Sequence, residues 1–209
     1  MLSPRYNSSR SAKDDQTKIA TNLKRFILEV RIQIGLVCRL ELYKAIRSRR
    51  SVRRYRPNPV PDQIIRKIVE AASWAPSSSN SQPWEFVVVR DRNTLEKLSR
   101  THAYAGMLKG APMCIVACSD PTRSPNHWVE DCSIAVENML LAARAEGLGT
   151  CWIAVYRPTD QQRENRVREV LSIPRDIRVV ALVGVGYPAE NPQPPARRKL
   201  EEIIHYEKY

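Results

Sequence analysis

Long hydrophobic stretches are missing from this sequence of 209 residues. No segment approaches the ~20 consecutive apolar residues that a membrane-spanning helix needs. The N-terminal residues show neither the apolar core nor the small-residue cleavage site of a secretory signal. We therefore expect a cytoplasmic protein without stable membrane insertion. Because 43% of the residues are hydrophobic, the chain is long enough for one well-packed domain and short for two.

Cysteine and histidine are also scarce, at five and three residues. No two cysteines form a CxxC pair, which argues against a disulfide framework and a structural zinc site. Cys114 and Cys118 lie in an apolar run typical of a strand, where an even offset places both on one face. We expect both to be buried as small hydrophobic residues. His102, His127 and His205 form no HExxH pair, so we expect no metal site and a structural role for each.

Acidic residues are too few to balance the basic ones, which leaves a formal net charge of +12. Residues 1–40 hold eight Lys or Arg against three Asp or Glu, a net of +5, so +7 remains for the rest of the chain. Much of that remainder falls in two clusters, Arg47–Arg56 and Arg197–Lys199. Short arginine clusters suit a small anionic ligand better than a nucleic-acid duplex. A basic nucleic-acid-binding protein that uses the N-terminal segment stays as the alternative from another functional class.

The chain divides at about residue 40. Residues 1–40 begin with a polar, Ser-rich stretch and continue as a basic amphipathic segment with helical spacing of apolar residues. This extension could be a membrane-surface anchor, a packing extension, or the product of a start codon assigned too early. We favour the last two interpretations. Residues 41–209 are expected to form the single domain.

Helical and strand patterns alternate through residues 41–209. Apolar periodicity predicts helices over 42–49, 62–74, 128–146 and about a dozen residues from Thr159. Continuous β-rich apolar runs predict strands over 84–90, 113–119, 150–156 and 178–186. The Pro-rich tail from Pro188 cannot pair regularly and is of a kind that often wraps over a surface. The predicted fold is α+β, a three-layer α/β/α arrangement with a mixed sheet of four or five strands.

Two polar segments could bind a ligand. Arg49-Arg50-Ser51-Val52-Arg53 closes the first helix, and its guanidinium groups could clamp a phosphate or stabilise a reduced, anionic flavin ring. On charge alone a solvated basic loop is the better interpretation. Ala75–Trp84 contains a Ser- and Asn-rich loop directly before a buried strand, where polar groups can surround a heterocycle. An exposed linker explains its composition equally well.

Taken together, RRSVR and, about thirty residues later, PSSSNSQPW resemble the FMN-binding signature of the nitroreductase superfamily. DCSIAVENMLLAARAEGLG, GTCWIAVY, VGVGYP and RRKLEEIIHYEKY resemble later parts of the same domain, so the resemblance covers about residues 41–209. It implies a nitroreductase-like fold that forms a homodimer, with FMN at the subunit interface.

The resemblance also implies roles for individual residues. The arginine cluster binds the FMN phosphate and ring, the Ser-rich loop approaches that flavin from the other subunit, and the strand after the glycine turn faces the ring. A tail arginine completes the phosphate site, and Arg197 is preferred over Arg198 because Lys199 replaces the proline that relatives often have. The implied cofactor-binding residues are Arg49, Arg50, Ser51, Arg53, Pro76, Ser77, Ser78, Asn80, Gln82, Ile153, Ala154, Arg197 and Arg198.

The reaction implied by the resemblance passes a hydride from NADH or NADPH through flavin N5 to a small electron-poor acceptor, such as a nitroaromatic or a quinone, in a ping-pong cycle. No side chain is needed as a catalytic acid or base. His127 and Trp128 are candidates for the substrate-facing rim, although Trp128 could equally fill the core. Reductive dehalogenation, flavin fragmentation and heterocycle oxidation are alternatives on the same fold. Each usually needs a lid or a distinct motif, and residues 101–128 show neither.

Overall fold

The computed structural model describes Leu23 and residues 42–209. The chain separates into two units, Met1–Lys44 and Ala45–Tyr209, and the fold described below is that of the second. Apart from Leu23, the segment for which an amphipathic extension is predicted lies outside the described residues. Residues 42–48 are helical, in agreement with the short helix predicted over residues 42–49.

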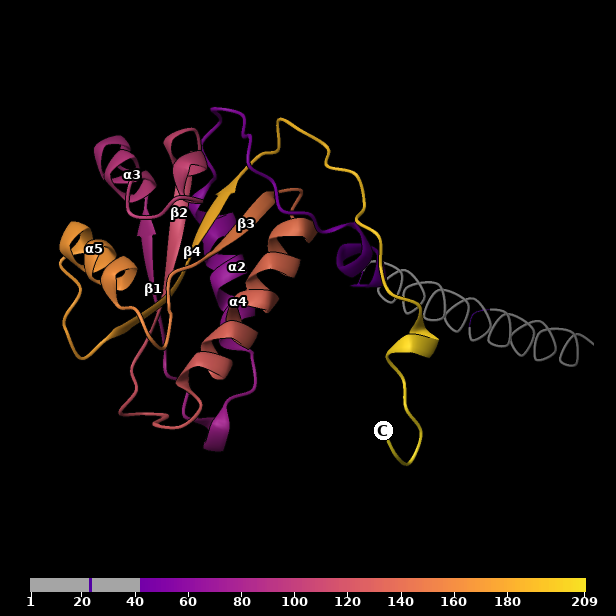
Figure 1. Ribbon diagram of the computed structural model, residues 1–209. Coiled ribbons are helices and arrows are strands. Elements are labelled where there is room, and N and C mark those ends of the chain that lie inside the picture. Colours follow the sequence, from indigo (N-terminus) through magenta and orange to yellow (C-terminus); the bar gives the residue numbers. More distant parts are fainter. Residues whose placement is uncertain (1–22, 24–41) are drawn as a thin grey trace, which may run out of the picture. The chain divides into compact units, whose positions relative to one another are not determined.

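Four strands form one sheet in the order β1-β2-β4-β3 (Figure 1). All neighbouring strands pair antiparallel. Parallel pairing is limited, within the described residues, to an isolated bridge between Ser51 and Thr150 at the β3 edge. The number of strands and their positions agree with the sequence-based prediction, but the mixed pairing predicted for the sheet is wrong for these four strands. Continuous apolar runs indicate burial on both faces, which the helices provide here, and carry no information on strand direction. Their bounds are Trp84–Val89 for β1, Met113–Ser119 for β2, Gly149–Ala154 for β3 and Arg178–Gly186 for β4.

Helices cover both faces of this sheet, which confirms the three-layer arrangement (Figure 1). Helices α2 (Asp62–Ser73) and α4 (Trp128–Ala145) pack on one face. Helices α3 (Arg92–Ser99) and α5 (Gln162–Leu171) pack on the other. Three short 3₁₀ helices lie in the connections and the tail, at Ser78–Asn80, Gly106–Lys109 and Leu200–Glu202.

Strand β2 divides the hydrophobic core in two, because successive side chains of a strand point to opposite faces. Its odd-numbered residues pack with α2 and α4, and its even-numbered residues pack with α3 and α5. Cys114 and Cys118 belong to the second set, so their predicted burial on one face is confirmed. Burial raises the pKa of each of these thiols to about 12. Both are therefore protonated, unreactive core residues at neutral pH.

Helix α4 ends where the glycines predict, and Gly147 adopts a positive φ of 76° directly after it. Helix α3 was not predicted, because its eight residues carry only two fully buried apolar side chains, Leu95 and Leu98. So short a segment offers few positions at which a helical repeat can be recognised. Its start is instead set by Asp91, whose carboxylate accepts a hydrogen bond from the Thr94 N–H at 2.7 Å.

Candidate functional site

The arginine segment, residues 49–56, lies against the first residues of β3. Val52 N–H donates to the Thr150 carbonyl at 2.9 Å, and Ser51 forms a parallel bridge with Thr150. A Cβ atom on Gly149 would lie 2.8 Å from the Val52 side chain, so this close approach requires glycine. The turn after α4 therefore packs directly against the arginine segment.

The arginine side chains of this segment differ in what they contact. Arg49 Nε lies 3.8 Å from Glu137 Oε1 of α4. Arg50 Nη1 donates to the carbonyls of Arg47 and Arg49, both at 2.7 Å, whereas Arg50 Nε is buried and has no acceptor in the described part of the chain. Arg53 is exposed, and its Nη1 makes only a long contact of 3.4 Å with the Ser51 carbonyl. Arg50 and Arg53 thus retain donor capacity for an anion.

A small cavity of about 50 Å³ lies at the base of the arginine segment, and Arg49, Arg50, Arg144, Thr150 and Glu190 are among the residues that line it. Arg144 Nε donates to Ser48 Oγ at 2.9 Å, which fixes a further guanidinium beside this cavity. The walls therefore carry three arginines against one carboxylate. This charge balance favours an anionic group.

β3 is an edge strand, and beyond the Thr150 bridge the side of its backbone that faces away from β4 is open in the described part of the chain. The Thr150 carbonyl faces away from β4, because it accepts from Val52. Alternation along an antiparallel strand then turns the backbone groups of Trp152 and Ala154 to the same open edge, and those of Ile153 toward β4. The Ile153 side chain is buried in the core on the α5 face. Of the two residues that the resemblance implies, Ala154 and not Ile153 therefore offers free backbone groups.

The Ser-rich loop is fixed by Asp131 in the first turn of α4. The buried Asp131 carboxylate accepts from Ser78 N–H at 3.0 Å and from Ser124 Oγ at 2.7 Å. Within the loop, Gln82 N–H donates to Ser77 Oγ at 3.0 Å. The left-handed residues of the loop are Ser79, Asn80 and Gln82, with φ of 52°, 53° and 47°. Such conformations cost free energy in residues other than glycine and are often found at binding sites.

One chain does not bring the two segments together. The Ser-rich loop meets α4 at Asp131, whereas Arg49 of the arginine segment and the adjacent Ser48 meet it at Glu137 and Arg144. Along the helix, Asp131 is about 9 Å from Glu137 and about 20 Å from Arg144, at 1.5 Å per residue. Within the described residues, no hydrogen bond or ion pair joins the tail arginines to either segment: Arg197 is exposed, and Arg198 pairs locally with Glu202 at 3.6 Å.

The two rim candidates have different surroundings. His127 is exposed directly before α4. Trp128 belongs to the core, where it packs edge-on against Tyr156 with ring centroids 4.8 Å apart. The Arg178 guanidinium lies 4.8 Å from the centroid of the Trp128 ring, a cation–π contact. Trp128 therefore has the packing role that the sequence left open, and its edge toward Tyr156 lies at the end of β3.

Two carboxylates of the site were not singled out in the sequence. Asp131 fixes the Ser-rich loop, and Glu190 accepts hydrogen bonds from the backbone of Arg53 and Arg54. Both positions look like ordinary surface acids in sequence, because their partners are distant in the chain. The available signal was local: Asp131 interrupts a strongly apolar helix, and Glu190 follows the GYP turn after β4.

Known proteins are similar to this chain in both sequence and fold. The model of the Nitroreductase family matches residues 46–102 and 96–187. A protein of Methanothermobacter thermautotrophicus described as an NADH dehydrogenase/NAD(P)H nitroreductase is 42% identical over 179 residues, which are 84% of this chain and 91% of that protein.

Solved structures give the same assignment. A protein from Parabacteroides distasonis, also described as an NADH dehydrogenase/NAD(P)H nitroreductase, superposes with a TM-score of 0.76 at 38% identity and covers 80% of this chain and 98% of its own. An FMN-dependent nitroreductase from Clostridium difficile gives a TM-score of 0.72 at 32% identity and covers 80% and 99%. The chain therefore belongs to the nitroreductase family of oxidoreductases.

Proposed function

We propose that this protein is an FMN-dependent oxidoreductase that passes a hydride from NADH or NADPH to a small electron-poor acceptor such as a nitroaromatic or a quinone. The observation that carries the proposal is the buried Nε of Arg50, which has no acceptor in the described residues, beside an arginine-lined cavity at the open edge of β3. A buried donor without an acceptor costs about 1–3 kcal/mol, so a bound anion would recover that free energy.

The phosphate end of FMN fits this cavity by charge and by donor type. Arg49 and Arg50, which line the cavity, would hold the phosphate from one side, and Ser51, the next residue in the chain, would add a hydroxyl. Arginine suits phosphate because its planar donor groups match two oxygens at once. Arg197 of the tail is the further arginine that we expect at the phosphate.

The ring end fits the free edge of β3. Outward-facing backbone groups of Trp152 and Ala154 alternate donors with acceptors, as the polar edge of a flavin requires. The exposed Arg53 guanidinium extends from the neighbouring segment and would place positive charge beside the ring. Positive charge there favours the reduced, anionic form of a flavin.

When bound, FMN supplies the hydride chemistry at N5, and successive use of one pocket by donor and acceptor gives a ping-pong cycle. The protein residues bind and orient. Side chains of the arginine segment fix the cofactor, and the backbone of β3 holds its polar edge. Trp128 and Tyr156 pack together at the end of β3 and would form an apolar wall that excludes water from one side of the bound cofactor. No side-chain acid or base is required in this scheme.

We also propose that the functional unit is a homodimer, with the Ser-rich loop of one subunit approaching the cofactor held by the other. A second copy would bring together the two segments that one chain holds apart at α4. Exposed apolar side chains support such an interface, and they include Ile46, Ile134 of α4, and Leu200, Ile203 and Ile204 of the tail. Residues 193–209 are exposed throughout, which suits a tail that packs on a partner.

The remaining assignments complete the proposal. We assign residues 41–209 to the FMN-binding domain and residues 1–40 to an extension, in a cytoplasmic enzyme. No helix in the described ranges is long and apolar enough to cross a membrane. The +12 net charge is explained in part by the arginines that would face the cofactor, so nucleic acid is not the partner that we propose.

The decisive experiment is an absorption spectrum of the purified protein before and after anaerobic addition of NADH or NADPH, with heat-released cofactor identified by mass. We expect bound FMN that bleaches with at least one of the two donors. A colourless protein that takes up no added FMN would contradict the proposal. Binding to nucleic acid that weakens steeply with salt and requires residues 1–40 would then support the alternative class.

A further inference from the structure

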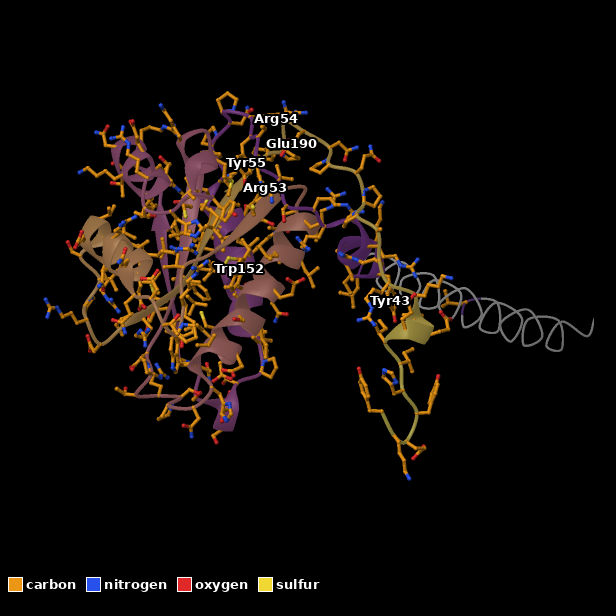
Figure 2. All side chains as sticks on the ribbon, viewed as in Figure 1. Tyr43, Arg53, Arg54, Tyr55, Trp152 and Glu190 are labelled. Atoms are coloured by element: carbon orange, nitrogen blue, oxygen red, sulfur yellow. The ribbon has the colours of Figure 1, made fainter. Side chains whose placement is uncertain are left out.

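Glu190 makes an unusual set of contacts with the arginine segment. Its Oε1 accepts from the backbone N–H of Arg53 at 2.6 Å and from that of Arg54 at 3.1 Å. Its Oε2 accepts from Arg54 Nε at 3.0 Å. The Glu190 side chain is only 18% exposed, and Figure 2 shows it beside Arg53, Arg54 and Tyr55. One carboxylate thus binds two consecutive amides and one guanidinium.

These two amides form no other hydrogen bond within the described chain. Before them, Val52 N–H donates to the Thr150 carbonyl of β3, and after them, Arg56 N–H donates to the Tyr187 carbonyl, both at 2.9 Å. Ala189 N–H donates back to the Arg54 carbonyl at 2.9 Å. The arginine segment is therefore held by β3 on one side and by residues 187–190 on the other, and Glu190 closes the gap between these two attachments.

The contacts also distinguish two adjacent arginines. The guanidinium of Arg54 is engaged by Glu190, whereas that of Arg53 makes only the 3.4 Å contact with the Ser51 carbonyl. The hydrogen bond from the Arg53 N–H, and after it the hydrogen bonds and charge of Arg54, lower the pKa of Glu190, so the carboxylate is ionised at neutral pH. Without Glu190, both guanidinium groups would be free and the backbone that orients them would lose its acceptor.

We propose that Glu190 is a positioning residue for the cofactor site: it fixes the backbone of the arginine segment so that Arg53, and not Arg54, is presented to FMN. This inference rests on the proposed function. Glu190 acts through Arg53 and needs no contact with the cofactor itself.

The test is the dissociation constant of FMN, measured by quenching of flavin fluorescence with the full-length protein. We expect Glu190→Ala to raise this constant by about tenfold, because two backbone amides lose a charged acceptor. Glu190→Gln keeps an acceptor oxygen and should stay within roughly threefold of the parent protein. Arg54→Ala is the matched control: it removes the ion pair but neither amide bond, and should also stay within roughly threefold.

A double-mutant cycle distinguishes positioning from a general structural role. If Glu190 acts through Arg53, Glu190→Ala should weaken binding by less than about threefold when Arg53 is already alanine. An equal loss of FMN affinity whether Arg53 is present or replaced by alanine would overturn the inference. An unchanged dissociation constant of FMN in Glu190→Ala would overturn it as well. Should Glu190→Ala not fold, Glu190→Asp takes its place, because its shorter side chain cannot reach the two amides and the Arg54 guanidinium together and should weaken binding by at least about threefold.

Hydrogen exchange of the flavin-free proteins gives a readout that needs no cofactor. Peptides covering residues 50–56 and 187–191 should exchange faster in Glu190→Ala than in Arg54→Ala, while β2 peptides stay protected in both. Unchanged exchange in those two segments would also count against the inference. Failure of the parent protein to bind FMN would contradict the proposed function, whereas normal binding by both the parent and Glu190→Ala would contradict only the role of Glu190.

Discussion

At the scale of single residues, Asp131 is the main support of the Ser-rich loop. It is buried and accepts from Ser78 N–H and Ser124 Oγ. Asp131→Ala should lower the free energy of unfolding by about 1–3 kcal/mol, because it leaves these donors without their acceptor. It should also weaken FMN binding by releasing the left-handed loop residues. Urea denaturation and flavin titration measure the two effects, and Glu130→Ala, an exposed neighbour, is the control.

The proposed phosphate-binding arginines give a second prediction at the scale of single residues. Arg49→Ala combined with Arg197→Ala should weaken FMN binding by at least about a hundredfold, since each charge-assisted contact contributes roughly 1.5–3 kcal/mol. The fold should persist, because neither guanidinium lies in the core. Arg66→Ala with Arg175→Ala removes the same charge from exposed positions and should leave binding unchanged. Full retention of FMN by the first double variant would show that the phosphate-binding arginines are assigned wrongly.

At the scale of elements, helix α5 is attached to the sheet by one buried carboxylate. Glu164 is completely buried, and its Oε1 lies 2.8 Å from both Arg168 Nη2 and Arg178 Nε. Glu164 Oε1 also accepts from Val179 N–H of β4 at 2.9 Å. Glu164→Gln should lower the free energy of unfolding by about 3 kcal/mol, because it leaves two guanidinium groups without their counter-charge. Urea denaturation tests this, and Glu169→Gln on the exposed side of α5 is the control.

The same carboxylate predicts a pH dependence. Burial alone would raise the pKa of Glu164, but hydrogen bonds from Arg178 and Val179 and the charges of Arg178 and Arg168 lower it overall. A group whose pKa is lowered by folding stabilises the protein above its unfolded value of about 4.3. The difference in unfolding free energy between the parent protein and Glu164→Gln should therefore be complete at pH 7 and shrink as the pH falls below about 4. A difference that does not change with pH would contradict this origin.

At the scale of the whole molecule, the proposed dimer predicts that α4 is an interface helix. Ile134 is 42% exposed on α4, and Ile134→Asp should shift the protein from dimer to monomer in size-exclusion chromatography with light scattering. FMN binding should weaken in parallel, since the Ser-rich loop of the partner is lost. Val88→Asp is matched in exposure, at 41%, but lies on β1, and should leave the dimer intact. A monomeric parent protein would rule out the shared site.

Much of the fold could be predicted from local patterns. The four strands have continuous apolar runs, and α2, α4 and α5 have apolar residues at helical spacing. Helix α3 has too few apolar residues for that signal. The Ser51–Thr150 bridge also escaped prediction, because it joins segments about a hundred residues apart and no local pattern specifies such pairing.

The sequence by itself determined the layers and the two polar segments, because hydrophobic periodicity and the residue types around RRSVR and PSSSNSQPW are local properties of the chain. Only the tertiary structure decided which groups of those segments are available. The backbone groups of Ile153 face β4 while those of Ala154 face the open edge, and the guanidinium of Arg54 is engaged by Glu190 while that of Arg53 makes only a long contact with the Ser51 carbonyl in the described residues. The physical reason is that a group's availability depends on the partners that it has already found. Those partners, Asp131 and Glu190 among them, come from distant parts of the chain.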